Sequence, residues 1–168
     1  MSEKDTTTSS APTPAPSPME LVLQFHHTYS VPIRPFSDPT LDYERMNMRM
    51  SLIAEEFAEL MGAVYGPRAR AIIEAATVEA VAADEGERDV IEAADALADL
   101  VYVVYGMAIE SGMNLDSVLA EVQASNLSKL MPDGSVKLRE DGKVLKGPNF
   151  FQPNIARGLG LESPSDGS

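Results

Sequence analysis

Cysteine and tryptophan are both missing from this sequence of 168 residues. Without cysteine, the chain can form no disulfide, no zinc–thiolate site and no cysteine nucleophile, and this composition suits a reducing compartment. Aromatic residues make up only 6% of the chain, whereas alanine and methionine are plentiful. This balance favours helices over sheets.

Basic residues are also scarce, because 13 Lys and Arg face 26 Asp and Glu and give a formal net charge of −13. A surface of this sign repels phosphate backbones and anionic lipid, so we expect neither nucleic acid nor a membrane as a partner. The longest apolar stretch, 93–109, carries Asp95 and Asp99 and does not suit a bilayer. The first apolar stretch follows no basic segment of the signal-peptide kind, so we expect a cytoplasmic protein.

Proline and small polar residues mark the expected limits of the folded region. Residues 1–18 are rich in Ser, Thr and Pro and hold too little apolar surface to offset the entropy of ordering, so we expect a disordered tail. Residues 157–168 look similar and are expected to form a flexible tail. The intervening 19–156 are long enough to form one domain with its own core.

Helical periodicity runs through most of this domain. We expect helices at about 18–29, 42–65, 68–83, 87–111 and 115–130, with Asp42 and Asn114 as N-caps. The stretch 135–147 alternates around Asp141-Gly142, which predicts a short hairpin or an ordered loop. The sequence therefore predicts an all-α helical bundle of about five helices with an irregular C-terminal segment.

The helix expected at 42–65 carries three acidic residues on one face. Glu55, Glu56 and Glu59 cover about a third of its circumference, roughly opposite an apolar stripe that includes Ile53 and Phe57. Taken alone, this group also fits a solvated acidic surface.

A second acidic group lies on the helix expected at 87–111. Glu92, Asp95 and Asp99 share one face of a segment that is otherwise almost entirely apolar, which indicates a central helix. Carboxylates near a core cost several kcal/mol unless they are paired or bound to a metal. Arg88, one turn before Glu92, is the local candidate for a salt bridge.

The two acidic groups can line one pocket if their helices face each other. Carboxylate oxygens select Mg²⁺ or Mn²⁺ over Zn²⁺. The two histidines, His26 and His27, are not expected to be ligands. Bound metal ions would also let such an acidic protein hold a nucleotide, because they bridge carboxylates and phosphates.

The two acidic groups resemble the EExxE and ExxD motifs of the all-α nucleoside triphosphate pyrophosphatases, a MazG-like superfamily with dimeric-dUTPase-like members. The first motif is Glu55-Glu56-Phe57-Ala58-Glu59, and the literal second motif is Glu92-Ala93-Ala94-Asp95. A second register is possible, because DALADLVYVVYG (95–106) resembles the stretch in which the motif Asp precedes LxYVxYG. That register selects Asp99, with Asp95 in place of the motif Glu. We favour Asp95 and Asp99 as direct ligands and Glu92 as a supporting group.

Further resemblances follow in the same order along the chain, over roughly residues 20–152. They comprise a Phe-His pair before a proline-containing loop, the string SNLSK (125–129) and the string DGKVLKG (141–147). Together with the aromatic of the second acidic string, they imply these substrate contacts: Phe25, His26, Tyr102, Asn126, Lys129, Lys143 and Lys146. Plainer interpretations remain for these residues. Lys129 also suits the negative end of a helix. Solvated surface also suits Asn126, Lys143 and Lys146, and a core also suits Phe25 and Tyr102.

The resemblance implies hydrolysis of a nucleoside triphosphate between its α- and β-phosphates, giving a monophosphate and pyrophosphate. The implied catalytic residues are Glu55, Glu56, Glu59 and Asp99, with Mg²⁺ as cofactor and Mn²⁺ as a substitute. The implied role is house-cleaning of the nucleotide pool, with dUTP favoured, by a homodimer or a dimer of dimers. Two alternatives stay open: an enzyme like phosphoribosyl-ATP pyrophosphohydrolase, or a non-enzymatic helical dimerisation module.

Overall fold

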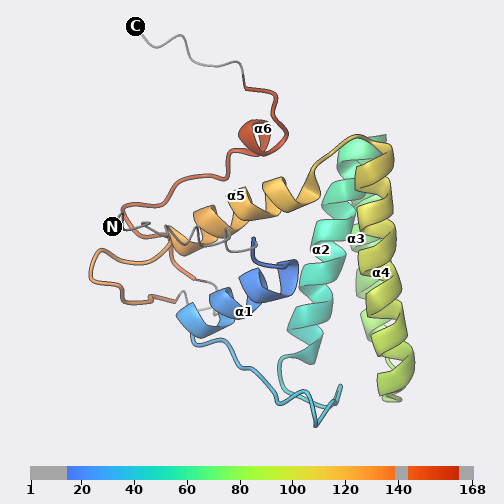
Figure 1. Ribbon diagram of the computed structural model, residues 1–168. Helices are drawn as coiled ribbons and strands as arrows, with labels where there is room; N and C mark the ends of the chain where they lie inside the picture. Colours follow the sequence, from blue (N-terminus) through green and yellow to red (C-terminus); the bar gives the residue numbers. More distant parts are fainter. Residues whose placement is uncertain (1–14, 139–143, 163–168) are drawn as a thin grey trace, which may run out of the picture. The chain divides into compact units, whose positions relative to one another are not determined.

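A computed structural model describes residues 15–138 and 144–162, and the described chain is mainly helical (Figure 1). The helices are α1 (Pro18–Thr28), α2 (Met46–Tyr65), α3 (Pro67–Ala82), α4 (Val90–Glu110), α5 (Leu115–Leu127) and α6 (Ile155–Gly158). The described residues contain no β-strand, only an antiparallel bridge between Leu138 and Val144. The all-α fold class is therefore confirmed. The bridge lies where the sequence predicts a hairpin or an ordered loop, whose turn falls outside the described residues.

The starts of α1 and α5 both have side-chain caps from residues of the usual capping types. The Ser17 hydroxyl accepts a hydrogen bond from the Glu20 amide, and the Glu20 carboxylate accepts one from the Ser17 amide at 2.7 Å. This capping box, followed by Pro18, fixes the start of α1. At α5, Asn114 Oδ1 accepts from the Ser117 amide at 3.1 Å, which confirms the predicted cap.

Two predicted helix starts are wrong by about one turn. α2 begins at Met46 after Arg45, which makes no side-chain cap, whereas Asp42 uses its own amide to donate to Thr40 Oγ1 at 3.0 Å. α4 begins only at Val90, because Asp89 Oδ1 accepts from the amides of Ile91 and Glu92 at 2.9 and 3.0 Å. At Asp42 a local turn replaces the predicted cap, whereas Asp89 caps the later start of α4, because its carboxylate accepts from amides of the first turn.

The chain divides into two compact units, which are described separately. The first contains the described residues up to Ile33 and those from Val104 onward, and in it α5 packs against α1 and α6. Tyr29 is buried there, and its hydroxyl donates to the Asn126 carbonyl oxygen at 2.6 Å. Gln123, also buried, donates to Gln24 Oε1 at 3.0 Å. These bonds connect α1 with α5.

The second unit, Arg34–Val103, is built around the hairpin of α2 and α3 and includes the first part of α4. Gly66 joins α2 to α3 with a φ of +95°, a conformation that L side chains rarely adopt. Gly62 lets the helices approach closely, because a Cβ there would lie 3.1 Å from Arg70 Cβ. Ala58 is only 1% exposed.

The prediction that the 87–111 helix is central is wrong for the single chain. Ile91, Tyr102 and Ile109 of α4 are 84%, 80% and 75% exposed. No other described helix packs closely along α4. The stripe on α2 is also half exposed, with Phe57 at 47%. Hydrophobic patterning fixes which faces avoid water, but it does not tell whether the same chain or another copy covers them. None of the described helices has the length and hydropathy needed to cross a membrane.

Candidate active site

The first acidic group lies along α2, with all three carboxylates exposed to solvent. Arg70, on α3, contacts Glu59 at 3.1 Å and Glu74 at 2.7 Å. Glu55 and Glu56 form no ion pair with any described residue. The hairpin of α2 and α3 therefore neutralises one of the three carboxylates and leaves two unpaired.

The second acidic group lies on α4, and it too is exposed and unpaired. Within 15–138 and 144–162, Glu92, Asp95 and Asp99 make no ion pair. Two carboxylates one helical turn apart repel each other, so this face favours a cation.

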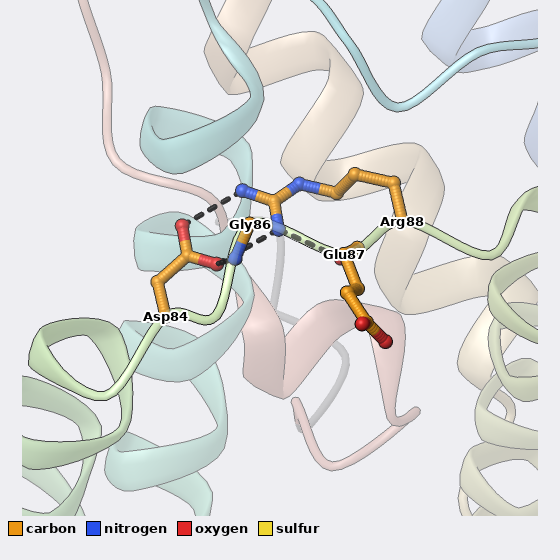
Figure 2. Close-up of polar contacts among 4 residues, drawn as sticks. All are labelled: Asp84, Gly86, Glu87 and Arg88. Atoms are coloured by element: carbon orange, nitrogen blue, oxygen red, sulfur yellow. Dashed lines mark hydrogen bonds and ion pairs between the residues drawn. The ribbon is translucent and has the colours of Figure 1, made fainter.

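Arg88 does not pair with Glu92, so that salt-bridge interpretation is wrong. Its guanidinium donates to both carboxylate oxygens of Asp84, at 2.8 and 2.7 Å, and to the Glu87 carbonyl oxygen (Figure 2). Asp84 Oδ1 also accepts from the Gly86 amide at 2.9 Å. These hydrogen bonds, led by that of Arg88, lower the pKa of Asp84 to about 2. Arg88 is thus paired within its own loop, and it does not neutralise the acids of α4.

The six carboxylates suit a divalent cation in chemistry, since they offer only hard oxygen ligands. Their positions do not yet form a complete metal site, because no three acidic or histidine side chains of the described residues lie close enough together to hold an ion. The fold thus presents two separate rows of donors, one on α2 and one on α4.

The second unit also contains an apolar hollow of about 810 Å³ between α2, α3, the start of α4 and the loop at Leu41 and Tyr43. None of the six predicted metal ligands lines it. Asp84 and Arg88 do line it, and they are already paired with each other. Tyr102 is not among the lining residues and is exposed.

The predicted contacts from the string SNLSK lie together in the first unit. Lys129 Nζ donates to Asn126 Oδ1 at 2.7 Å, as the spacing of three residues predicts. Partial burial, and then the neighbouring Lys146, lower the pKa of Lys129. No acidic side chain of the described residues pairs with Lys129. A cation of this kind is ready to accept an anionic ligand.

The other predicted substrate contacts lie in different surroundings. Lys146 Nζ lies 4.3 Å from the centre of the Phe150 ring, and Lys143 lies outside the described residues. The Phe25 ring packs at 4.5 Å on the ring of Tyr29. His26 Nδ1 lies 3.1 Å from the Pro32 carbonyl oxygen. Phe25 therefore also has the packing role that its residue type suggests.

Sequence reasoning missed the residues that hold the SNLSK string in place. Tyr29 bonds to its backbone, and both of its serines bond to the backbone of Phe151. The serines stand in the quoted string and were open to recognition as hydrogen-bonding groups. The hydrogen bond from Tyr29 to Asn126 joins residues 97 positions apart, so local sequence spacing does not predict it.

Comparisons with known proteins identify the family and a similar fold. The family described as phosphoribosyl-ATP pyrophosphohydrolase matches residues 22–126. The crystal structure of a candidate NTP pyrophosphohydrolase from Exiguobacterium sp. 255-15 is similar, with a TM-score of 0.67 and 27% identity over 86% of this chain and 94% of that chain. No curated protein sequence matches significantly.

Proposed function

Given that this chain belongs to the phosphoribosyl-ATP pyrophosphohydrolase family, we propose that it hydrolyses a nucleoside triphosphate between the α- and β-phosphates, with a divalent metal ion as cofactor. The products are a nucleoside monophosphate and pyrophosphate. Membership in this family makes the protein a hydrolase of phosphoanhydride bonds. The choice of a nucleoside triphosphate as substrate is supported by the similarity to the Exiguobacterium protein.

The family match carries this proposal, because it covers every predicted metal ligand. Residues 22–126 contain both acidic groups, together with Phe25, His26, Tyr102 and Asn126. Within the part of the chain that the structure describes, the two rows of carboxylates are unpaired except at Glu59, which suits a cation-binding role. A non-enzymatic module gives no account of this match.

We assign the metal to Glu56, Glu59, Asp95 and Asp99, with Glu92 as a supporting group. A bound Mg²⁺ or Mn²⁺ would withdraw charge from the α-phosphate and orient it. Glu55 has no ion pair in the described chain, so its carboxylate is available to take a proton from the attacking water as general base. Its alternative role is to help hold a second ion.

Asn126 and Lys129 are assigned to bind the phosphates or the sugar. The ammonium group of Lys129 is partly withdrawn from water and has a second lysine as its neighbour, so an anion relieves the repulsion between the two. Lys146 and Lys143 are assigned to neutralise the departing pyrophosphate.

The preferred base is a finer proposal. We favour dUTP, on the resemblance to dimeric-dUTPase-like enzymes, and nucleotide house-cleaning as the role. The description of the matched family favours phosphoribosyl-ATP as a second candidate. Both substrates are cut at the same α–β bond, so the reaction class is common to them.

The test is pyrophosphate release from a panel of NTPs, dNTPs and phosphoribosyl-ATP, with Mg²⁺, with Mn²⁺ and with EDTA. We expect metal-dependent release of pyrophosphate from dUTP and none in EDTA. Turnover of phosphoribosyl-ATP alone would replace the substrate but keep the reaction. Release of orthophosphate alone, or no turnover with either metal, would contradict the proposal.

We also propose that the protein works as a homodimer or a dimer of dimers, because α4 exposes a continuous apolar surface. The exposed side chains along α4 include Leu97, Leu100, Val101, Val104 and Met107. Only three hydrophobic residues of the described chain are buried, namely Tyr29, Ala58 and Ala108. Exposed apolar patches of this kind mark interaction sites, and a second copy supplies a matching apolar face.

A further inference from the structure

Residues 144–151 begin within the predicted stretch 135–147 and return to the end of α5, where three hydrogen bonds hold their backbone. The Gly147 amide donates to the Lys129 carbonyl oxygen at 3.0 Å. The Ser125 hydroxyl donates to the Phe151 carbonyl oxygen at 2.8 Å, and the Phe151 amide donates to Ser128 Oγ at 3.1 Å. Ser128 in turn donates to the Ser125 carbonyl oxygen at 2.7 Å. The two serines of SNLSK therefore bind the same residue of the returning segment, one through its backbone carbonyl oxygen and the other through its amide.

Gly147 is the point at which this segment comes closest to α5. A Cβ at Gly147 would lie 2.3 Å from the Leu130 carbonyl oxygen and 3.0 Å from the Lys129 carbonyl oxygen. Both obstacles are backbone atoms, which cannot move aside as a flexible side chain does. Gly147 does not have a positive φ, so the reason for glycine is the close approach and not the backbone conformation.

The docked segment has a consequence for charge. Lys146 directly precedes Gly147, and its ammonium group comes near enough to Lys129 to lower the pKa of that lysine. The ring of Phe150, four residues after Lys146 in the same segment, has its centre 4.3 Å from Lys146 Nζ. Holding two lysines together costs electrostatic energy in the free protein, and a phosphate chain between them recovers it.

We infer that Ser125, Ser128 and Gly147 are positioning residues that dock the segment 144–151 and thereby set Lys146 beside Lys129 as a two-lysine site for a pyrophosphate group. This inference rests on the proposed function, which assigns the two lysines to phosphate. It adds three residues that do not touch the substrate but determine whether Lys146 lies beside Lys129.

Two measurements on the full-length chain test this inference. Amide hydrogen exchange of residues 147 and 151, without nucleotide or metal, reports docking directly. Calorimetric titration with inorganic pyrophosphate in EDTA reports the two-lysine site without relying on turnover. Gly147→Ala should speed the exchange of both amides and weaken pyrophosphate binding by about tenfold, close to the loss in Lys146→Met.

The double variant decides whether the two effects share one cause. If Gly147 acts by placing Lys146, then Gly147→Ala combined with Lys146→Met should bind pyrophosphate no more weakly than either single variant. Ser128→Ala removes the acceptor of the Phe151 amide and the donor to the Ser125 carbonyl oxygen, but little volume. It should show a smaller change in the same direction, and it tests docking independently of whether Gly147→Ala folds. Gly106→Ala is the control, because a Cβ at Gly106 meets no atom within 4 Å.

The outcomes separate this inference from the proposed function. If Lys129→Met and Lys146→Met bind pyrophosphate as the wild type does, the phosphate role of the lysines is wrong and the inference falls with it. A different result would overturn only the inference: both lysine variants lose pyrophosphate binding, while Gly147→Ala speeds amide exchange but binds pyrophosphate as the wild type does. Additive losses in the double variant would also overturn it.

Discussion

Lys129 combines partial burial with a like-charged neighbour, and both lower its pKa below the ordinary lysine value. Its protonated form is needed to bind phosphate, so nucleotide affinity should fall as pH rises, beginning below the usual lysine pKa of about 10.5. For the free protein the sign is opposite: the unfolded chain holds this proton to higher pH, so this group makes folding more favourable as pH rises through that window.

Lys129→Arg gives the matched comparison, because arginine stays protonated throughout this range. We expect KM for the nucleotide to rise with pH in the wild type and to stay flat to higher pH in the variant. Profiles of KM against pH between about 7 and 10 check this. Identical profiles for the two proteins would show that another group titrates.

The unpaired carboxylates lead to a prediction on turnover. Glu55→Ala and Asp99→Ala should each lower kcat by at least about a hundredfold, because one removes the assigned base and the other an assigned ligand. Circular dichroism should show unchanged helicity, since both side chains are exposed. Glu79→Ala, an exposed acid on α3 outside both motifs, is the control. Full activity in both site variants would reject these assignments.

At the scale of single residues, the sequence predicts which side chains of one helix meet or share a face. Asn126 and Lys129 meet because they are three residues apart, and Glu55, Glu56 and Glu59 share a face for the same reason. Local spacing does not predict contacts that depend on chain return. Tyr29 reaches Asn126 across 97 positions, and Gly147 reaches Lys129 through a loop whose path no periodicity specifies.

Among the helices, the hairpin of α2 and α3 depends on the residue that joins them. Gly66 adopts a φ of +95° with a ψ of 172°, and a side chain there is strained even though no atom lies within 4 Å of its Cβ position. Gly66→Ala should therefore lower the free energy of unfolding by about 1–3 kcal/mol. Gly106→Ala, inside α4, should cost nothing or slightly stabilise, because alanine is the better helix former.

Urea unfolding curves for both variants check this comparison. Equal midpoints for Gly66→Ala and the wild type would mean that the joint adopts another conformation in solution. Periodicity predicted all five long helices, whereas the starts of α2 and α4 were placed about one turn too early. Asp42 and Asp89 are both capping residue types, but only Asp89 has backbone amides of a helix within reach of its carboxylate.

At the scale of the whole molecule, the single chain leaves the apolar face of α4 exposed to solvent. The sequence predicts a buried helix, and the chain alone exposes Val101 at 57% and Leu97 at 50%. Burial of such side chains is worth about 25 cal/mol per Å², so covering the face with a second copy yields a large gain. The acids of α4 do not oppose this, because Asp95 and Asp99 point to a different side of the helix from Leu97 and Val101.

The wild type should therefore have about twice or four times the chain mass of 18.1 kDa in light scattering at micromolar concentration. Val101→Asp places a charge in the apolar face and should shift the mass toward 18.1 kDa. It should also make the melting temperature lower and independent of protein concentration, since association stabilises the folded chain by mass action. Ser111→Asp adds the same charge at an exposed position just after α4 and should leave the mass unchanged. A wild-type protein that is monomeric under these conditions would contradict the proposed dimer, and the apolar face of α4 would then need an occupant other than a second copy.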